Sequence, residues 1–561
     1  MSAEEASKTW FEKYPKLFEQ QSDILKSFGF QLNQETLSKH RQIVFEGHSK
    51  VDPQRQLIVA FPQAFPSCAP KIFDKPSSKL LTRHHRNDTR QLCLFSFSEN
   101  NWNASLSVAD ALAEAENLIS KFKAGSAVLE NQPPEPLTRA IQYIPNAAML
   151  VPPPISTFKD FAKLNSLVGR FSAKFVHDGE FKRETRGRGV ILEASFGAEK
   201  MRCSRQYSNY FGKNGAEIIG DWFYLQNPPT HENLQDVIKK CFQKIHGVKK
   251  APFYWLGLIF CEETGVAGQT RTTWLIVRAN AAGEFHLIRT FPYIENERYV
   301  RIPGLEGLEK KCVTIVGCGS LGSKIAVNLA ASGVNRFHLV DCDYFEPNNS
   351  VRHELGVECF GLNKEHALLN RLSSLNPAVA ENSSSVNFQV GATNTFDREL
   401  QFNKIVNESD LIIDTTAIHS VSRFFNELSF ELRIPTLFAT VTNGAWGGEI
   451  VRTIPGKTPC WLCWLDQYYD NKPPSAPDLT AEIFAPGCDQ PTFTGTTYEL
   501  GMVANLATSI AVDTLLGSKD FSKNYIRWSG KDRTGQPIYL TEILPTSHQK
   551  ECLYCGSRNE I

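Results

Sequence analysis

The stretch from residue 312 to residue 352 constrains the fold more than any other part of the chain. Its sequence is CVTIVGCGSLGSKIAVNLAASGVNRFHLVDCDYFEPNNSVR. The pattern predicts a buried strand over 313–316, a helix over 321–332 and a second strand over 336–340. The turn between the first strand and the helix carries Gly317, Gly319 and Gly322. This order predicts a strand–turn–helix–strand unit whose helix N-terminus presents N–H groups to a phosphate.

The residues after this turn indicate which nucleotide it binds. The second strand ends at Asp341, where a ribose hydroxyl needs an acceptor, and this suits NAD and ATP equally. Asn349, Arg352 and Lys364 follow, and Asp414 ends a later apolar strand. Adenylyl transfer needs cations that neutralise a triphosphate and a carboxylate that holds Mg²⁺. Hydride transfer needs neither, so an NAD-dependent dehydrogenase is the least favoured interpretation.

These motifs resemble the ThiF/MoeB/ubiquitin-activating superfamily. The family's order is GxGxxG, Asp-x-Asp, Asn-x-x-Arg, a lysine after a glycine, and Asp-x-Thr-Asp-Asn. The matching residues here are Gly317, Gly319, Gly322, Asp341, Asp343, Asn349, Arg352, Gly361, Lys364 and Asp414-Thr415-Thr416. Ala417 stands in place of the family's second acid, which leaves the Mg²⁺ role to Asp414. The resemblance implies a Rossmann-like adenylation domain that binds ATP and Mg²⁺, with Arg352 and Lys364 as its catalytic cations.

An arginine ahead of the first strand has a further role in the resembled family. It reaches across a homodimer to the triphosphate bound by the partner. Arg298 and Arg301, in NERYVRIPGLEGLEKK, are the two candidates here, and we assign Arg301 to the nucleotide site. An ordinary surface pair is the alternative. The resemblance therefore also implies a homodimer.

The cysteines point to metal ligation and thiol chemistry. The chain has 14 of them and a polar, charged start that does not read as a signal peptide, so a disulfide framework is not expected. Cys460, Cys463, Cys552 and Cys555 form two CxxC pairs. Two such pairs complete a closed structural Zn²⁺ site. The alternative is four unrelated thiols or a redox pair. A zinc site would attach the C-terminal segment to its domain, because metal binding contributes folding free energy.

Cys488 is a candidate nucleophile in the same region. It lies between a Pro/Ser-rich stretch and a helix predicted over 501–516. This layout resembles activating enzymes that handle ubiquitin-like modifiers through a loop cysteine, including the autophagy type. The resemblance implies that Cys488 takes the acyl group from the adenylate as a thioester. A purely structural cysteine is the competing interpretation.

Residues 1–125 form a separate α+β module, with an opening helix, two strand-like segments and a proline-rich segment. Cys93 follows in an apolar run, Trp102 lies nine residues later, and a helix is predicted from near Ser105. This arrangement resembles a ubiquitin-conjugating enzyme. It implies that Cys93 is an acyl-accepting nucleophile and that Asn87, in a His-Arg-Asn triplet, donates to the oxyanion. An inert buried thiol is the alternative.

The remaining chain connects these two modules. Residues 126–155 are Pro-rich without a sustained period, which predicts a linker. Residues 156–295 contain several strand-like runs and one amphipathic helix, which predicts an α+β connecting domain with a docking or scaffold role. The activating domain then spans 296–561. The predicted fold class is α/β and α+β multidomain.

Composition limits the partners. Lys+Arg and Asp+Glu both number 60, which gives no reason to expect nucleic acid or an anionic membrane as a partner. No apolar run reaches the ~18 residues of a membrane span. A cytoplasmic enzyme is expected.

The order of the modules resembles bacterial fusion enzymes of anti-phage CBASS operons. The resemblance implies that the chain activates the flexible C-terminus of a cGAS-like nucleotidyltransferase with ATP. The acyl group then passes from Cys488 to Cys93 and finally to target amines. Two alternatives stay open: a sulfur-carrier protein adenylyltransferase, and a non-catalytic adaptor with a degenerate nucleotide site.

Overall fold

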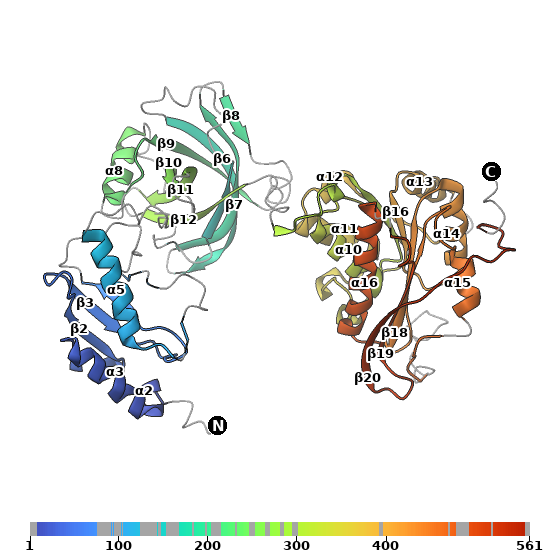
Figure 1. Cartoon of the computed structure of the whole chain (residues 1–561). Helices are drawn as coiled ribbons and strands as arrows, with labels where there is room; N and C mark the ends of the chain where they lie inside the picture. Colours follow the sequence, from blue (N-terminus) through green and yellow to red (C-terminus); the bar gives the residue numbers. More distant parts are fainter. Residues whose placement is uncertain are drawn as a thin grey trace. The chain divides into compact units, whose positions relative to one another are not determined.

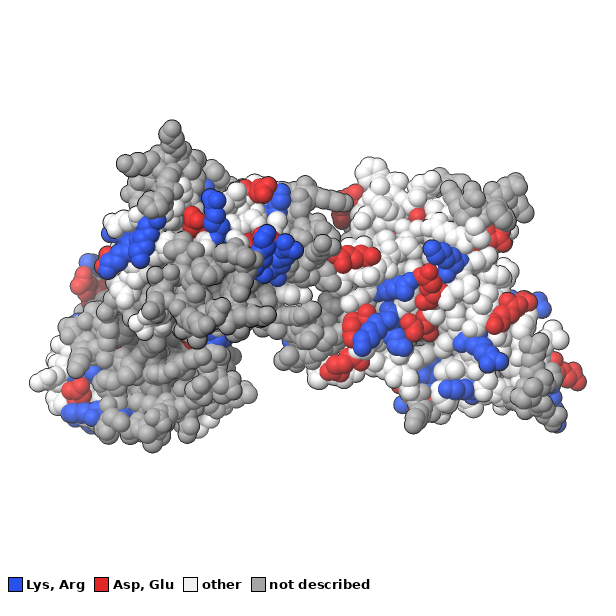
Figure 2. Space-filling view, turned by 90° about the horizontal axis from the view of Figure 1, so that it is seen from above, with Lys and Arg blue, Asp and Glu red and all other residues white. Residues whose placement is uncertain are grey.

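The computed structural model divides the chain into two compact units, Met1–Tyr293 and Ile294–Ile561 (Figure 1). Within the described residues, no helix has the length and apolar composition needed to cross a bilayer. On the described surface seen in Figure 2, the C-terminal unit carries Lys and Arg next to Asp and Glu, not a field of one sign. The structure describes residues 8–75, 91–92, 94, 102–103, 105–123, 143, 147–152, 168–181, 184–196, 199–202, 215–229, 233–245, 253–263, 270–280, 285–293, 301–391, 396–468, 472–477, 493–517 and 520–555.

The chain begins with a four-stranded antiparallel sheet in the order β1-β2-β3-β4, accompanied by helices. The buried face of the last helix, α5, carries Val108, Leu112 and Ile119, which recur at the spacing of an amphipathic helix. The elements are α2 (Trp10–Lys13), α3 (Pro15–Ser27), β1 (Gln31–Leu32), α4 (Gln34–His40), β2 (Val44–His48), β3 (Gln56–Ala60), β4 (Lys71–Asp74) and α5 (Val108–Lys123).

Two hydrogen bonds fix the proline-rich segment and the start of helix α5. The indole N–H of Trp102 donates to the carbonyl of Pro66 at 2.8 Å. The hydroxyl of Ser107 donates to Asp110 at 2.9 Å, and the helix begins one residue later. The predicted nucleophile Cys93 and its predicted oxyanion donor Asn87 lie outside the described residues.

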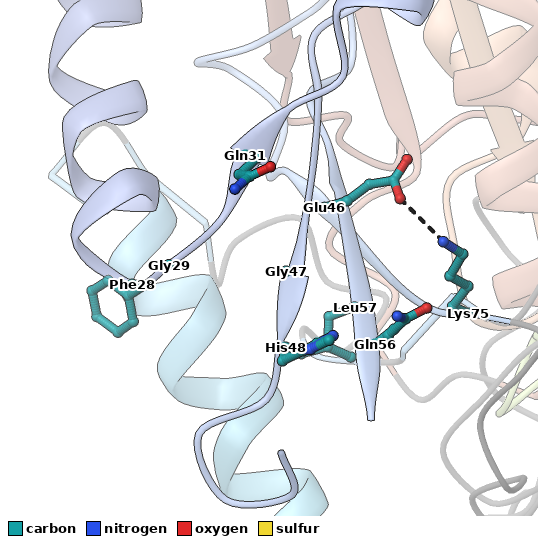
Figure 3. A pocket seen from close by; sticks show the side chains of 9 residues that line it. All are labelled: Phe28, Gly29, Gln31, Glu46, Gly47, His48, Gln56, Leu57 and Lys75. Carbon is teal, nitrogen blue, oxygen red and sulfur yellow. Dashed lines mark hydrogen bonds and ion pairs between the residues drawn. The ribbon is translucent and has the colours of Figure 1, made fainter. Parts of the chain in front are cut away.

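A pocket of about 480 Å³ lies on this sheet (Figure 3). Across it, Lys75 pairs with Glu46 at 3.2 Å, and the Asn33 amide donates to the same carboxylate at 2.7 Å. These two partners, Asn33 first, lower the pKa of Glu46. None of the predicted site residues that the structure describes lines this pocket.

A closed β-barrel follows in the same unit. Strand β5 pairs in parallel with both β12 and β7, which closes the ring β5-β12-β11-β10-β9-β6-β7, and β8 adds to β7. Aromatic side chains including Trp222, Trp274 and Phe171 fill the interior, while α8 covers part of the outer surface. The elements are β5 (Ala147–Val151), β6 (Val168–Phe181), β7 (Glu184–Phe196), β8 (Glu199–Arg202), β9 (Ala216–Leu225), α8 (Leu234–Lys244), β10 (Phe253–Glu263), β11 (Thr270–Asn280) and β12 (Phe285–Pro292).

This barrel corrects the predicted linker over 126–155. Residues Ala147–Val151 form β5, and the side chains of Ala147, Met149 and Val151 are buried in the barrel. The strand is only five residues long and prolines follow it, so its alternation was hidden in a Pro-rich stretch. Its place depends on pairing with strands far along the chain, which a local pattern does not reveal.

The C-terminal unit is an eight-stranded sheet in the order β15-β14-β13-β16-β17-β18-β19-β20. Its elements are η7 (Leu308–Lys310), β13 (Cys312–Val316), α10 (Ser320–Ser332), β14 (Arg336–Asp341), η8 (Pro347–Val351), η9 (Val357–Cys359), α11 (Lys364–Leu375), α12 (Val379–Asn382), β15 (Ser384–Asn387), α13 (Phe396–Asn407), β16 (Leu411–Asp414), α14 (His419–Leu432), β17 (Thr436–Val441), β18 (Gly447–Thr453), α15 (Trp461–Tyr468), α16 (Thr497–Leu515), β19 (Tyr525–Lys531) and β20 (Pro537–Ile543).

The first five strands of this order are parallel, and helices cover both faces of the sheet (Figure 1). Helices α10, α11 and α16 pack on one face, and α13, α14 and α15 pack on the other. Every residue of β13 is buried, as expected for a strand covered on both sides. Successive strands are added to one side of β13 (β14, then β15) and then to its other side (β16, then β17), so the strand order reverses between β13 and β16. Open α/β sheets bind ligands at the carboxyl ends of strands at such a point.

Candidate functional site

The glycine turn lies at the carboxyl end of β13. Gly317 takes a φ of +86°, which favours glycine, and helix α10 begins at Ser320 after Gly319. Gly319 offers no side chain to cap the first N–H groups of α10, and a Cβ there would meet no atom of the described residues within 4 Å. A Cβ at Gly322 would lie 2.0 Å from the carbonyl oxygen of Gly317 and 2.6 Å from Oγ1 of Thr415. The turn is therefore closed on its protein side and open at the helix N-terminus, as a phosphate site requires.

Asp341 lies beside this turn at the end of β14. One carboxylate oxygen accepts the N–H of Cys318 at 2.6 Å, and the other accepts the N–H of Asp343 at 2.8 Å. Burial raises the pKa of Asp341, and these two bonds oppose the rise. The acid therefore holds the glycine turn, and its predicted contact with a ribose stays a prediction.

Lys364 is brought to the same place by the start of helix α11. Its ammonium group lies 2.9 Å from the carboxylate of Asp343, and its backbone N–H donates to the carbonyl of Asp343 at 3.0 Å. Asp341, Asp343 and Lys364 thus come together across residues that are far apart in sequence. A phosphate could bind this ammonium group by competing with the carboxylate of Asp343 for it.

Arg352 is oriented by the short helix η8. The carbonyl of Asn349 accepts the backbone N–H of Arg352 at 3.1 Å, while the Asn349 side chain accepts the N–H of Glu346 at 3.2 Å. The Nε–H of Arg352 donates to the hydroxyl of Ser320 at 3.0 Å. In the described part of the chain, its two terminal nitrogens have no hydrogen-bond partner. The guanidinium group is thus fixed at the helix N-terminus with donors left for an anion.

His353 is a site residue that the sequence did not indicate. Its Nε2–H donates to the carbonyl of Cys318 at 2.7 Å, and its Nδ1 accepts the N–H of Leu355 at 3.1 Å. The next residue, Glu354, pairs with Lys324 of α10 at 2.7 Å. The segment after Arg352 therefore holds the glycine turn in place. The only sequence signal was adjacency to Arg352.

We expect His353 to make the C-terminal unit sensitive to acid. Burial lowers the pKa of His353 to about 4, against about 6.5 in an unfolded chain. As the pH falls below about 6.5, the unfolded chain binds a proton that the folded chain does not, so stability falls until about pH 4, by about 3 kcal/mol at most. We expect the urea midpoint of the unit to fall between pH 7 and pH 5, and to fall less in His353→Gln. Equal pH dependence in both proteins would contradict this role for His353.

Asp414 does not fit the predicted role of Mg²⁺ ligand. It ends β16 with only 2% of its surface exposed. One oxygen accepts the N–H and hydroxyl of Thr416 at 2.9 and 2.7 Å, and the other accepts the hydroxyl of Ser422 at 2.6 Å. Both oxygens are therefore occupied by protein donors. The same motif supports the turn, because Thr415 donates to the carbonyl of Gly317 at 2.6 Å.

An apolar pocket of about 260 Å³ opens on the α13 and α14 face of the sheet. It is lined by the segment after β15 and by residues near the starts of α13 and α14, which follow the carboxyl ends of β15 and β16. The lining is apolar and aromatic with a few polar groups, as in sites for planar ligands. The lining residues are Phe388, Val390, Gly391, Glu399, Phe402, Asn403, Ser420, Val421 and Phe424.

The predicted metal-binding cysteines converge. The sulfur atom of Cys460 lies 3.8 Å from that of Cys463 and 3.4 Å from that of Cys552. The sulfur atoms of Cys463 and Cys555 lie 3.3 Å apart. These spacings are too long for an S–S bond and close to the ~3.8 Å that a tetrahedral site with Zn–S bonds of ~2.3 Å requires. The four thiols are buried, and the N–H of Gln549 points at the sulfur of Cys463. This donor set fits Zn²⁺ with no position left for water.

The structure describes one of the remaining predicted residues. Arg301 is exposed ahead of β13. Arg298 and Cys488 lie outside the described residues, as do Cys93 and Asn87.

Comparisons with known proteins agree with the C-terminal geometry. Residues 295–553 match the ThiF family model. A Sinorhizobium fredii (strain NGR234) protein named y4oA is 24% identical over 542 residues, 88% of each chain. The ATP-dependent ubiquitin transferase-like protein Cap2 of Vibrio cholerae is 32% identical over 126 residues, which cover 22% of this chain and 20% of Cap2. A structure of E. coli MccB with ATP is 20% identical, covers 47% of this chain and 75% of MccB, and has a TM-score of 0.36. The C-terminal unit is thus similar to ThiF-family proteins over almost its whole length.

Proposed function

We propose that this chain uses ATP to activate the C-terminal carboxylate of a partner protein and passes the acyl group through two cysteines to target amines. The observation that carries the proposal is the N-terminus of α10, where Ser320 accepts the Nε–H of Arg352. The two terminal guanidinium nitrogens have no partner among the described residues, and Lys364 is held nearby by Asp343. This arrangement binds and neutralises phosphates. Hydride transfer does not need such a pair of cations at the phosphates.

The first step is adenylation. A carboxylate oxygen of the partner attacks the α-phosphorus of ATP, the bond to the bridging oxygen breaks, and pyrophosphate leaves. The N–H groups at the start of α10, with Arg352 and Lys364, stabilise the negative charge that develops on the phosphates. Asp341 accepts a ribose hydroxyl, and the apolar pocket near α13 and α14 takes the base. Mg²⁺ bound to the triphosphate would supply further charge neutralisation; because Asp414 does not fit it, we assign it no protein ligand.

Two thioester steps follow in the proposal. The Cys488 thiolate attacks the acyl carbonyl and AMP leaves with the bonding electrons. The Cys93 thiolate then attacks the thioester and Cys488 leaves as a thiolate. A target amine attacks last, Asn87 donates to the oxyanion, and Cys93 leaves. These steps are supported by the motifs around each cysteine and by the similarity to Cap2, and the ATP makes them possible because forming a thioester from a carboxylate is uphill.

The partners follow from the same chemistry. The activated protein needs a flexible C-terminus that reaches the glycine turn, and a cGAS-like nucleotidyltransferase is our first candidate. The four cysteines would hold a structural Zn²⁺. A homodimer in which Arg301 reaches the partner's nucleotide, and a cytoplasmic location, complete the proposal.

Exchange and adduct measurements on the full chain test this function. With ATP and a candidate nucleotidyltransferase, we expect ATP–pyrophosphate exchange that Arg352→Ala reduces about 100-fold. Non-reducing mass spectrometry should detect a covalent adduct that is lost in Cys488→Ala and stays on Cys488 in Cys93→Ala. Cys68→Ala, which removes an exposed thiol outside the relay, should behave like the wild type.

The alternatives give different results. A sulfur-carrier adenylyltransferase would show the exchange in the wild type but would form no adduct on Cys488 or on Cys93. A non-catalytic adaptor would exchange nothing. Either result would remove the proposed relay.

A further inference from the structure

The guanidinium group of Arg352 is held from two directions. On one side its Nε–H is bonded to the hydroxyl of Ser320 at 3.0 Å. On the other side the ring of Phe493 lies with its centroid 5.5 Å from the guanidinium carbon, within the range of a cation–π contact. Burial lowers the pKa of Arg352, which reflects how far its surroundings exclude water. Ser320 stands at a variable position of the glycine turn, whereas Phe493 is 141 residues from Arg352 along the chain.

The position of Phe493 is itself fixed by the turn between β17 and β18. The next residue, Thr494, donates from its hydroxyl to the Asn443 side chain at 2.8 Å and accepts the N–H of Gly444 at 2.8 Å. A Cβ at Gly495 would lie 3.0 Å from the Phe493 ring and 2.8 Å from the side chain of Ala445. The ring is thus packed closely against Gly495, and the backbone on its C-terminal side is hydrogen-bonded to a different part of the sheet.

We propose that Phe493 is a positioning residue for phosphate recognition, which rests on the proposed function. The ring stacks on the guanidinium group and holds it in the orientation in which its Nε–H also donates to the hydroxyl of Ser320. The two terminal nitrogens then point to the anion site without a loss of side-chain freedom on binding, and such pre-organisation raises affinity. A leucine of similar volume would fill the space but would lack the negative face that attracts the cation.

Nucleotide binding to the full chain tests this role. We expect Phe493→Leu to weaken the binding of Mg·ATP by about 3- to 30-fold, the range that a cation–π contact gives. Adenosine has no phosphates, so its affinity should not change. Phe493→Tyr keeps the ring face and should bind Mg·ATP nearly as the wild type does. In an Arg352→Ala background, Phe493→Leu should have little further effect, because the group that it orients is gone.

Several results would overturn the proposal. Wild-type affinity for Mg·ATP in Phe493→Leu would exclude the role, and so would an equal loss for ATP and adenosine, which indicates a packing role only. An undiminished effect in the Arg352→Ala background would exclude coupling through the arginine. Phe493→Met serves as a second variant without a ring if the leucine protein does not fold. If the wild type binds no Mg·ATP, the proposed function fails first, whereas a normal wild type with an unaffected Phe493→Leu refutes this inference alone.

Discussion

Replacing Gly322 by alanine should abolish ATP binding and destabilise the C-terminal unit by about 3 kcal/mol or more. The added Cβ would lie 2.0 Å from the carbonyl oxygen of Gly317, a distance at which the backbone must move. It would also lie 2.6 Å from the Thr415 hydroxyl, which donates to that same carbonyl. Because backbone cannot rotate away as a side chain can, the turn and the start of α10 would have to separate. Thermal unfolding and calorimetric titration with Mg·ATP measure the two effects.

Gly319→Ala is the matched control for this prediction. It adds the same methyl group three residues earlier, where no atom of the residues that the structure describes lies within 4 Å, and the backbone has an ordinary negative φ. We expect the protein to fold with nearly wild-type stability but to bind ATP poorly, because the methyl group would stand in front of the first N–H groups of α10. A Gly322→Ala protein that melts and binds like the wild type would refute the assigned geometry of the turn.

The glycine turn could be read from the sequence because all of its signals are local. A buried strand, three glycines, a helix and a second strand follow one another within thirty residues of Cys312, and the observed bounds of β13, α10 and β14 differ from the predicted ones by at most one residue. The order of Asp341, Arg352 and Lys364 along the chain also predicted which side chains gather at the turn. Parallel strands bring their carboxyl ends to one edge, so sequence order carries over into space.

Features that depend on distant pairing were not predictable in this way. Closure of the barrel requires β5 to pair with two strands that follow it along the chain, and the β5 sequence is too short to signal it. The contact between Phe493 and Arg352 joins residues 141 positions apart, so neither residue marks the other. Asp414 stands at the sequence position of a metal ligand, yet the hydroxyl groups of Thr416 and Ser422 donate hydrogen bonds to its carboxylate.

One local signal was available and was missed. Helix α16 begins at Thr497 and not at residue 501, because Thr496 and Glu499 form a capping pair. The Thr496 side chain accepts the N–H of Glu499, and its hydroxyl donates to the Glu499 carboxylate. A Ser or Thr three residues before a Glu is a known sign of a helix start. Applying that rule to TTYE would have placed the start correctly.

Substituting Cys463 by serine should remove one equivalent of zinc per chain and destabilise the C-terminal unit by about 4 kcal/mol or more, as loss of a structural metal does. Cys463 is fully buried, and its sulfur lies 3.3 Å from that of Cys555 in the last described turn of the chain. Without the metal, three thiols and a hydroxyl would remain buried together with no strong interaction among them. Elemental analysis of the purified full chain and thermal unfolding measure the outcome.

Cys312→Ala separates the loss of a metal from the loss of a buried thiol. Cys312 is as buried as the cluster residues and lies in the same unit, but it belongs to β13, and burial raises its pKa to about 12. A neutral thiol of this kind packs as a small apolar side chain, so its removal should leave zinc bound and cost little stability. The four clustered thiols differ from Cys312 because they come together from distant parts of the chain. Cys460 and Cys463 lie at the start of α15, whereas Cys552 and Cys555 follow the final strand. Two results together would show that packing alone holds the C-terminal segment: a wild-type chain without zinc, and a Cys463→Ser chain as stable as the wild type.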